Sequence, residues 1–287
     1  IPTLQCGPAK ARCRTSRMIY LDHNATTPLH PLALKAMLPF FKTSFGNPSS
    51  YHRAGRAAKA ALEKARHTIA RLLGAAPGEI VFTSGATEAD NLALRGVARA
   101  LRDRGRHIIT SSVEHHAVLK TCRSLEEEGW RVTCLPVDAR GRVAPEAVAG
   151  AIRPDTVLVS IMYANNETGV VQPVEEISAI CRHHHVLFHT DAVQAFGKMP
   201  FPAAGEICDL LSLSSHKIHG PKGAGALYIK NGTPIAPLLT GGHHEFGLRA
   251  GTENVPAIVG FAGVIGSLAL LLTGIGFLIR CCFPWKK

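Results

Sequence analysis

Apolar residues recur along positions 17–229 with two alternating periods, one typical of helices and one of strands. In Arg53–Leu73 they form one stripe with basic residues between them, which predicts an amphipathic helix. The same spacing predicts helices at Ala86–Arg102, His116–Glu128 and Val174–His184. Short runs rich in Val, Ile and Leu predict strands at Glu79–Thr83, His107–Thr110, Arg131–Pro136, Thr156–Met162, Val186–His189 and Leu210–Ser214. Because helices separate these strands, the pattern favours an α/β domain with a mainly parallel sheet flanked by helices.

The two ends of the chain depart from this pattern. Residues 1–17 are basic and contain no acid; we interpret them as a disordered leader, with a transit peptide as the alternative. From Val255 to Ile279 there are 25 positions without a charged residue, which makes 255–279 a candidate membrane segment. A buried helix is the alternative, although five glycines and Pro256 argue against it. We divide the chain into a leader (1–17), one α/β domain (18–262) and a divergent apolar tail (263–287).

The formal net charge of +11 is concentrated at the same two ends. Four basic residues in the leader and three in residues 280–287 account for seven of the 32 lysines and arginines. The remaining 25 basic and 21 acidic residues give the body of the chain a net charge of +4. A nucleic-acid surface needs a dense basic face, so this distribution argues against nucleic acid as a partner and suits an anionic small molecule better.

The eight cysteines form no CxxC pair and no regular disulfide spacing, which predicts a reducing, cytoplasmic location. Cys122, Cys134 and Cys181 fall in apolar-patterned segments, and we expect them to be small core residues. The histidine runs His183–His185 and His243-His244 have no acid or cysteine at ligand spacing beside them. The sequence therefore predicts no metal site.

Polar residues cluster at four places after predicted strands, where an open parallel sheet binds its ligand. The first is Thr83–Glu88, whose hydroxyls, glycine and helix start form an anion site, although a simple helix N-cap would look similar. The second is His189–Gln194. Its Asp191 fits either a helix N-cap or the carboxylate that keeps a pyridine nitrogen protonated.

The third cluster is Ser214–Lys217. A lysine at the end of a buried strand tends to have a lowered pKa, as a Schiff-base amine requires, but a surface lysine is the simpler interpretation of this cluster alone. The fourth is Asn165–Gly169, which could hydrogen-bond a ring oxygen or a substrate carboxylate and by itself is just a turn.

Together, these clusters resemble in order and interval the class V aminotransferase group of fold-type I pyridoxal-phosphate enzymes, and most closely the cysteine desulfurases. The matching stretches are Leu21–Pro28, Phe45–Ser50, Ser84–Asn91, Glu114-His115, Asn165–Gly169, Asp191–Gln194, His216-Lys217 and Arg249–Asn254. The resemblance covers about residues 18–262. It implies the large domain of that fold, with the small C-terminal domain largely missing.

The resemblance also implies roles toward pyridoxal 5'-phosphate. Lys217 would be catalytic, holding the cofactor as a Schiff base and shuttling protons, and Asp191 would pair with the pyridine nitrogen. His115, the second catalytic residue, would stack on the ring face; its alternative is a helix-capping histidine.

Further cofactor contacts follow from the same resemblance. Gln194 and Asn166 would lie on the side of the ring hydroxyl. The phosphate would be held by Ala86, Thr87, Ser214 and His216. Thr252 looks like the residue that reaches the phosphate of a partner subunit, so the resemblance implies a homodimer.

Two departures from the family affect the expected activity. The family's Gly-Gly-Gly-Gln/His-Glu-Arg stretch is here Gly241–Phe246, so a glycine and an arginine are replaced. After Ala262 the family continues into its smaller domain, which supplies a persulfide-forming cysteine on a mobile loop and an arginine that clamps the substrate carboxylate. Neither group has a counterpart here, and Cys281 and Cys282 lie too early to serve as the nucleophile.

The resemblance therefore implies a cysteine desulfurase, a sulfurtransferase acting on L-cysteine. Such an enzyme leaves alanine and passes a persulfide to a sulfur-acceptor or scaffold protein, for iron–sulfur cluster or thio-cofactor assembly. Without the cysteine loop, we expect this activity to be impaired. The alternatives are a selenocysteine lyase-like enzyme, which shares the motifs, and a non-catalytic remnant of the fold.

Overall fold

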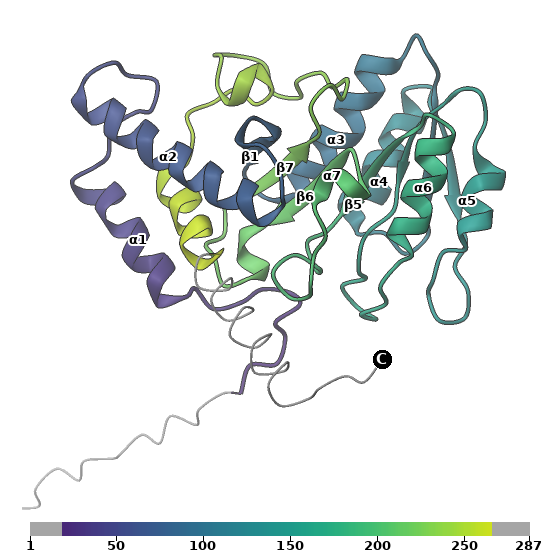
Figure 1. Ribbon diagram of the computed structural model, residues 1–287, viewed down its shortest axis with the longest axis horizontal. Helices are drawn as coiled ribbons and strands as arrows, with labels where there is room; N and C mark the ends of the chain where they lie inside the picture. The colour runs from purple at the N-terminus through teal and green to yellow at the C-terminus, as the bar shows by residue number, and fades with distance from the viewer. Residues whose placement is uncertain (1–18, 266–287) are drawn as a thin grey trace, which may run out of the picture.

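A computed structural model of the chain describes residues 19–265, whose centre is a single sheet (Figure 1). Its strands are β1 (Ile80–Thr83), β2 (His107–Ser111), β3 (Arg131–Leu135), β4 (Thr156–Ser160), β5 (Leu187–Asp191), β6 (Leu210–Ser214) and β7 (Gly225–Ile229). They lie in the order β1-β7-β6-β5-β4-β2-β3. Only β7 is antiparallel to its neighbours β1 and β6, so the mainly parallel sheet that the sequence predicts is confirmed.

Helices connect most of the strands, as the apolar periodicity predicts. They are α1 (Pro31–Lys42), α2 (Arg53–Leu72), α3 (Ala86–Leu101), α4 (His116–Glu127), α5 (Pro145–Ala151), α6 (Val174–His183) and α7 (Ala204–Ile207). Three short 3₁₀ turns lie at Pro77–Glu79, Ser215–Lys217 and Glu245–Gly247. A further helix occupies residues 255–265, so the boundary expected after Ala262 falls inside a helix.

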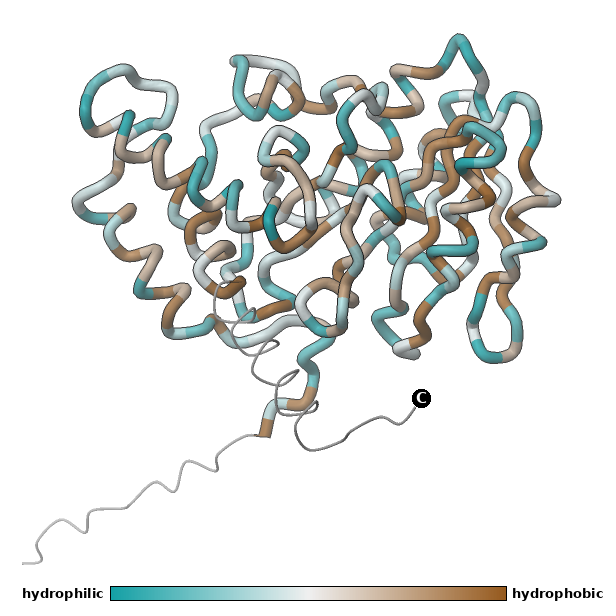
Figure 2. Tube along the Cα trace, in the orientation of Figure 1, coloured by the Kyte–Doolittle hydropathy of each residue, from teal (hydrophilic) through white to brown (hydrophobic). Residues whose placement is uncertain are grey.

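The sheet is covered on both faces, and each face has its own apolar cluster. On one face the strands pack against α2, α5, α6, α7 and the helix at 255–265, with Ile69, Ile177 and Phe261 among the buried residues. On the other face they pack against α3 and α4, with Leu94 and Leu125 buried. Figure 2 shows hydrophobic positions gathered along the strands and the inward sides of the helices. The molecule is thus a three-layer α/β/α domain, and its apolar burial holds the sheet as a rigid support.

Several elements differ from the sequence prediction. Helices α1, α5 and α7 and strand β7 were not predicted: α1 is only half-buried against residues 255–265, and α5 and α7 are short. Strand β7 follows a glycine-rich turn, and it was missed although it is as long as the predicted strands. Strand β5 runs on to Asp191, two residues past the predicted end. The expectation that Cys134 is a core residue is wrong: β3 is an edge strand and leaves that side chain exposed.

Within residues 19–265 no helix is long and apolar enough to cross a bilayer. The remainder of the candidate membrane segment, the basic leader and most of the apolar tail lie outside the described residues.

Candidate functional site

A pocket of about 720 Å³ lies where the carboxyl ends of the parallel strands meet. The segments that follow β1, β2, β4, β5 and β6 all contribute to its wall. Nine of the ten cofactor-binding residues expected from the sequence line it, namely Ala86, Thr87, His115, Asn166, Asp191, Gln194, Ser214, His216 and Lys217. Residues from five separate parts of the chain therefore meet at one place.

One end of the pocket is the start of α3. The residue that precedes the helix, Gly85, offers no side-chain cap, so the first N–H groups of the helix have no partner inside it. Strand β7 passes so close that a Cβ on Gly225 would lie 2.6 Å from the Cα of Gly85, which requires glycine there. Free N–H groups and the helix dipole make this cradle suited to an anion, and Thr87 and Ser214 add hydroxyls to its wall.

The cradle is fixed from outside by an ion pair. Glu88 accepts hydrogen bonds from the backbone N–H and the hydroxyl of Ser84, and its carboxylate lies 2.7 Å from Nε of Arg249. Burial acts to raise the pKa of Glu88, but the Arg249 and Ser84 hydrogen bonds outweigh it and leave that pKa below its usual value. The pair joins α3 to the loop that carries Thr252, and nothing in the local sequence pattern indicates it.

Lys217 lies in the 3₁₀ turn directly after β6, and its half-buried side chain lines the pocket. Its Nζ donates to the backbone carbonyls of Asn24 (2.6 Å) and Ala25 (2.8 Å). Burial lowers the pKa of Lys217, while Asp191 and Asp22 oppose that shift. The lowered pKa, expected from the position after a buried strand, increases the share of neutral, nucleophilic amine.

The segment around Asn24 and Ala25 belongs to the matched stretch Leu21–Pro28, and it is held against the lysine turn. Thr27 donates to the carbonyl of His216 from both its N–H (3.0 Å) and its hydroxyl (2.8 Å). The hydroxyl of Thr27 in turn accepts from the N–H of His219. These contacts explain why two stretches almost 200 positions apart belong to one site.

Asp191 is the last residue of β5; the residue is 6% exposed and lines the pocket. One oxygen accepts the N–H of Val193 at 3.0 Å. Burial raises the pKa of Asp191, against the opposing effects of the Val193 N–H, His115 and Lys217. Asp191 therefore caps the turn that follows β5 and also lines the pocket, so the two interpretations of this residue do not exclude each other.

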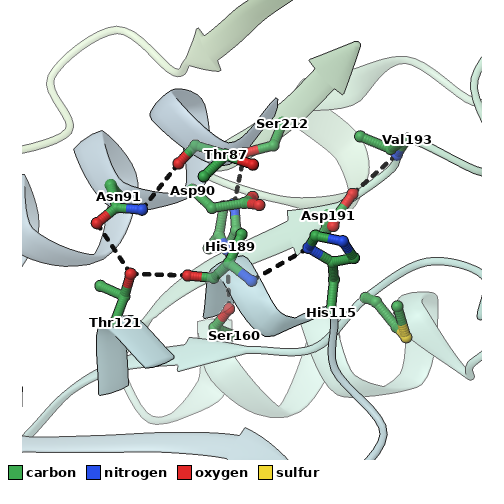
Figure 3. A network of polar contacts seen from close by, with 12 residues as sticks. Thr87, Asp90, Asn91, His115, Thr121, Ser160, His189, Asp191, Val193 and Ser212 are labelled. Atoms are coloured by element: carbon green, nitrogen blue, oxygen red, sulfur yellow. Dashed lines mark hydrogen bonds and ion pairs between the residues drawn. The ribbon is translucent and has the colours of Figure 1, made fainter. Parts of the chain in front are cut away.

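His115 likewise combines both interpretations that the sequence left open. It precedes α4, and its Nδ1 accepts the N–H of Ala117 as a helix cap, while the ring lines the pocket. Figure 3 shows the polar chain behind it: Thr121 donates to the carbonyl of Ala117 and to Asn91, and Asn91 donates to the carbonyl of Thr87. Since Nδ1 accepts a bond, the proton of the neutral ring lies on Nε2.

Asn166 and Gln194 line the pocket on the side of β4 and β5. Gln194 donates to the carbonyl of Asn24 at 3.0 Å and accepts from Lys198. Asn165, the residue before Asn166, caps its own turn by accepting the N–H groups of Glu167 and Thr168. The Asn165–Gly169 cluster is thus both a turn and part of the pocket wall.

Thr252 is the one expected residue that does not line this pocket. It is exposed and lines a neighbouring cavity of about 170 Å³ beside Arg249 and Glu253. Its separation from the cradle of its own chain is compatible with the expectation that it serves a partner subunit.

Three buried polar residues beneath the pocket were not predicted as site residues. Asp90 and His189 are 0% exposed and Glu114 is 5% exposed. The alternation His189-Thr190-Asp191 in a strand was the available signal, because residues two apart share one face of a sheet. Asp22, Asn24 and Lys222 also line the pocket without having been assigned roles.

None of the cysteines in residues 19–265 lines the pocket. Cys122, Cys181 and Cys208 are buried, and burial raises the pKa of each thiol, to about 12 for Cys122. Cys134 is exposed, and burial of its sulfur together with Glu114 raises its pKa as well. The same residues contain no group of three His, Cys, Asp or Glu side chains that could hold a metal ion.

Comparison with known proteins identifies the family of this arrangement. The family described as Aminotransferase class-V matches residues 19–272, which extends past Ala262. The chain is 52% identical over 255 residues to cysteine desulfurase IscS of Dictyoglomus turgidum, covering 89% of this chain and 64% of that protein. It is 54% identical over 245 residues to cysteine desulfurase IscS of Methanosarcina thermophila, covering 85% and 61%. The chain thus spans less than two thirds of the length of these relatives.

Solved structures give the same picture. A NifS-like protein superposes with a TM-score of 0.87 at 46% identity, over 89% of this chain and 71% of that one. A structure described as SspA in complex with cysteine superposes with a TM-score of 0.84 at 44% identity, over 86% and 72%.

Proposed function

The chain belongs to the class-V aminotransferase family, and from that premise we propose that it is the cofactor-binding part of a pyridoxal-phosphate-dependent cysteine desulfurase. The observation that supports this most strongly is the joint position of Lys217 and Asp191 on one pocket wall, with the α3 cradle at the end of the same pocket. An amine, a buried carboxylate and an anion cradle are the three groups that a phosphorylated pyridine aldehyde requires.

The described residues fit that cofactor. A Cβ at Gly85 would meet nothing within 4 Å, so the start of α3 is open to a phosphate. Asp191 lines the pocket, and only one of its oxygens accepts the N–H of Val193. Lys222 lines the pocket and adds positive charge that suits an anionic ligand.

Each residue then has a task in the chemistry. When bound, the cofactor supplies an aldehyde carbon and an electron-withdrawing ring. Lys217, with its lowered pKa, presents a neutral amine to that carbon and can afterwards hold the proton taken from a substrate α-carbon. Asp191 holds a proton on the ring nitrogen through its negative charge. His115 lines the pocket, and with Nδ1 occupied by the cap, its Nε2–H can donate a hydrogen bond to a bound group.

Sulfur removal from L-cysteine further requires a nucleophilic thiolate and a group that orients the substrate carboxylate. The pocket wall in residues 19–265 contains no cysteine and no arginine. We propose that these two groups belong to the part of the relatives that this chain does not match, and that residues 19–265 alone bind the cofactor without sustaining sulfur transfer.

The same proposal includes a homodimer, a sulfur-acceptor or scaffold protein as partner, and a cytoplasmic location. Thr252 supports the dimer, because it lies with Arg249 in a cavity beside the cradle and not in the pocket itself. A dimer in solution, measured by analytical ultracentrifugation with and without the cofactor, would support this part. A monomer in the presence of bound cofactor would contradict it.

Cofactor binding is tested by covalent attachment of the cofactor to its lysine. The purified chain is mixed with pyridoxal 5'-phosphate, reduced with borohydride and mapped by peptide mass spectrometry. We expect one labelled lysine, Lys217, and no label in Lys217→Ala. Lys222→Ala removes another amine of the same pocket and should retain the label. Label on another lysine, undiminished in Lys217→Ala, would contradict the assignment.

The test of sulfur transfer compares two proteins. Sulfide release from L-cysteine with a reductant is measured for the chain alone and for the chain fused to the C-terminal segment of a relative. We expect release by the fusion and little by the chain alone. Equal turnover would show that a cysteine of this chain is the nucleophile. Cofactor binding without turnover by the fusion would favour the non-catalytic alternative, and preference for selenocysteine would favour the lyase.

A further inference from the structure

The most unusual polar group outside the pocket wall is the carboxyl group of Asp90. It lies on α3 and is 0% exposed, and neither of its oxygens has a partner in good hydrogen-bond geometry among the described residues, although the hydroxyl of Ser212 is close enough to act on its pKa. A buried carboxylate without a partner carries a large desolvation cost, which such a group avoids by binding a proton. The position of Asp90 therefore needs a physical explanation.

The neighbour of Asp90 is His189 in the middle of β5. Its Nε2 lies 3.6 Å from an oxygen of Asp90. The ring bridges two adjacent strands, because Nδ1 contacts the hydroxyl of Ser160 on β4 at 2.8 Å and Nε2 contacts the hydroxyl of Ser212 on β6 at 3.0 Å. Figure 3 shows this row of polar side chains beneath α3, with Asp191 two residues further along the same strand.

All the ionisable groups that face Asp90 favour a neutral acid. The surroundings of Asp90 are the carboxyl groups of Asp191 on β5 and Glu114 before α4, and the fully buried ring of His189. Burial, then Asp191 and also Glu114 raise the pKa of Asp90 well above its usual value, while the hydroxyl of Ser212 opposes them. Burial lowers the pKa of His189 to about 3, so the ring is neutral as well.

Asp191 differs from Asp90 in having stabilising partners. It accepts the N–H of Val193 and is attracted by His115 and Lys217. When two carboxyl groups share a dry site, one proton and one negative charge are divided between them. Here the charge goes to Asp191 and the proton to Asp90. Burial also raises the pKa of Glu114 to about 8, against the opposing effects of the Ser111 hydroxyl and the Met162 N–H that its carboxyl group accepts.

We infer that Asp90 and His189 form an uncharged buried pair behind Asp191 and act as positioning residues, which keep Asp191 as the single charged carboxylate presented to the pocket. The importance of that charge for a bound pyridine ring rests on the proposed function; the uncharged state of the pair does not. An ionised Asp90 would repel the charge on Asp191 and weaken its hold on a ring proton.

The first test uses the chain without cofactor. Nitrogen-15 NMR of the histidine ring, assigned with His189→Gln, should show one protonated and one unprotonated nitrogen at His189 near neutral pH. Two protonated nitrogens would mean an ion pair with an ionised Asp90 and would overturn the inference.

The second test compares two replacements of Asp90 across pH. Asp90→Asn imitates the protonated acid. Because the folded pKa is raised, wild-type stability falls as the pH rises above the ordinary aspartate value, so the Tm advantage of Asp90→Asn should grow from none near pH 4 to about 2–4 °C near pH 8. A Tm below that of the wild type near pH 8 would again indicate a lost ion pair and overturn the inference.

The third test concerns the positioning role. Asp90→Leu keeps the volume but removes the polar group beside His189. We expect Asp90→Leu to weaken pyridoxal-phosphate binding about tenfold, and Asp90→Asn to change it less than about twofold and leave the pH midpoint of the bound cofactor's absorbance unchanged. Equal affinity in all three proteins would overturn the positioning role. If the wild type binds no cofactor, the proposed function fails, while the first two tests still decide the state of the pair.

Discussion

The two faces of β5 show how differently one strand is used. Phe188 points to the face covered by α2 and α6, where it is 1% exposed in a wholly apolar cluster. His189 points to the face covered by α3 and α4, where it is 0% exposed between Ser160, Ser212 and Asp90. Both residues are buried to the same degree, but Phe188 is held by apolar packing alone, whereas His189 is held by polar contacts inside the apolar cluster of its face.

The difference follows the position of the pocket. The Phe188 side chain does not contribute to the pocket wall, so its contribution is the free energy of apolar burial. The face with His189 lies directly under Asp191. There the strands carry the buried polar residues Ser160, His189 and Ser212 in place of apolar ones. Substitutions on the first face should therefore change stability alone, whereas those on the second should change the properties of the site.

The largest effect is expected from Phe188→Ala on the apolar face. Removing this side chain leaves a cavity and should lower the free energy of unfolding by about 3–5 kcal/mol, measured by urea denaturation. Phe188→Leu is the matched control and should cost less than about 1.5 kcal/mol. The pH midpoint of the bound cofactor's absorbance should be the same in both variants under folding conditions. A shifted midpoint would show that the two faces are not independent.

Asp191→Asn tests the end of the polar face. Asparagine can keep the cap to Val193, but it cannot supply a negative charge. We expect exchange of the α-hydrogen of L-alanine in heavy water, followed by NMR, to slow about a hundredfold, with a much smaller change in cofactor affinity. This reaction needs no protein thiol. Equal exchange rates in the two proteins would mean that Asp191 is only a cap.

The burial of His189 should be measurable in the pH dependence of the free energy of unfolding. Its pKa falls from 6.5 in the unfolded chain to about 3 in the folded one, so its contribution is present above pH 6.5 and is lost as the pH falls toward 3. Stability should decline there by up to about 1.4 kcal/mol per pH unit from this group. His189→Gln should flatten that part of the profile, measured by thermal unfolding against pH. An unchanged profile would mean that the ring is not buried as described.

The smallest effect is expected from Thr121→Val. It removes the hydroxyl that joins Asn91 to the carbonyl of Ala117 and thereby links α3 with α4 behind His115. The loss should be about 1 kcal/mol in the free energy of unfolding, with Thr121→Ser close to the wild type. Chemical denaturation of the three proteins decides it. Unchanged stability in Thr121→Val would mean that the hydroxyl contributes nothing to the free energy of unfolding.

The sequence by itself determined the α/β class, the mainly parallel sheet and the pocket residues from Ala86 to Lys217. The class and the sheet follow from local periodicity, and the four polar clusters follow from the rule that parallel strands present their carboxyl ends at one edge. The individual site residues, His115 among them, were implied by the resemblance to the family. The same local signals could not predict β7, which reverses the direction of the sheet and closes the cradle through Gly225. They also failed at Cys134, because an edge strand exposes a residue that its apolar neighbours would suggest is buried.

Only the tertiary structure decided which buried polar groups meet. Asp90 and His189 are almost 100 positions apart, and nothing in either local pattern indicates the other. Their contact depends on α3 crossing the face of β5, and their uncharged state depends on the exclusion of water and on the carboxyl groups of Asp191 and Glu114. Periodicity specifies which side of an element is buried, whereas the charge state of a buried group depends on neighbours that only the folded chain brings together.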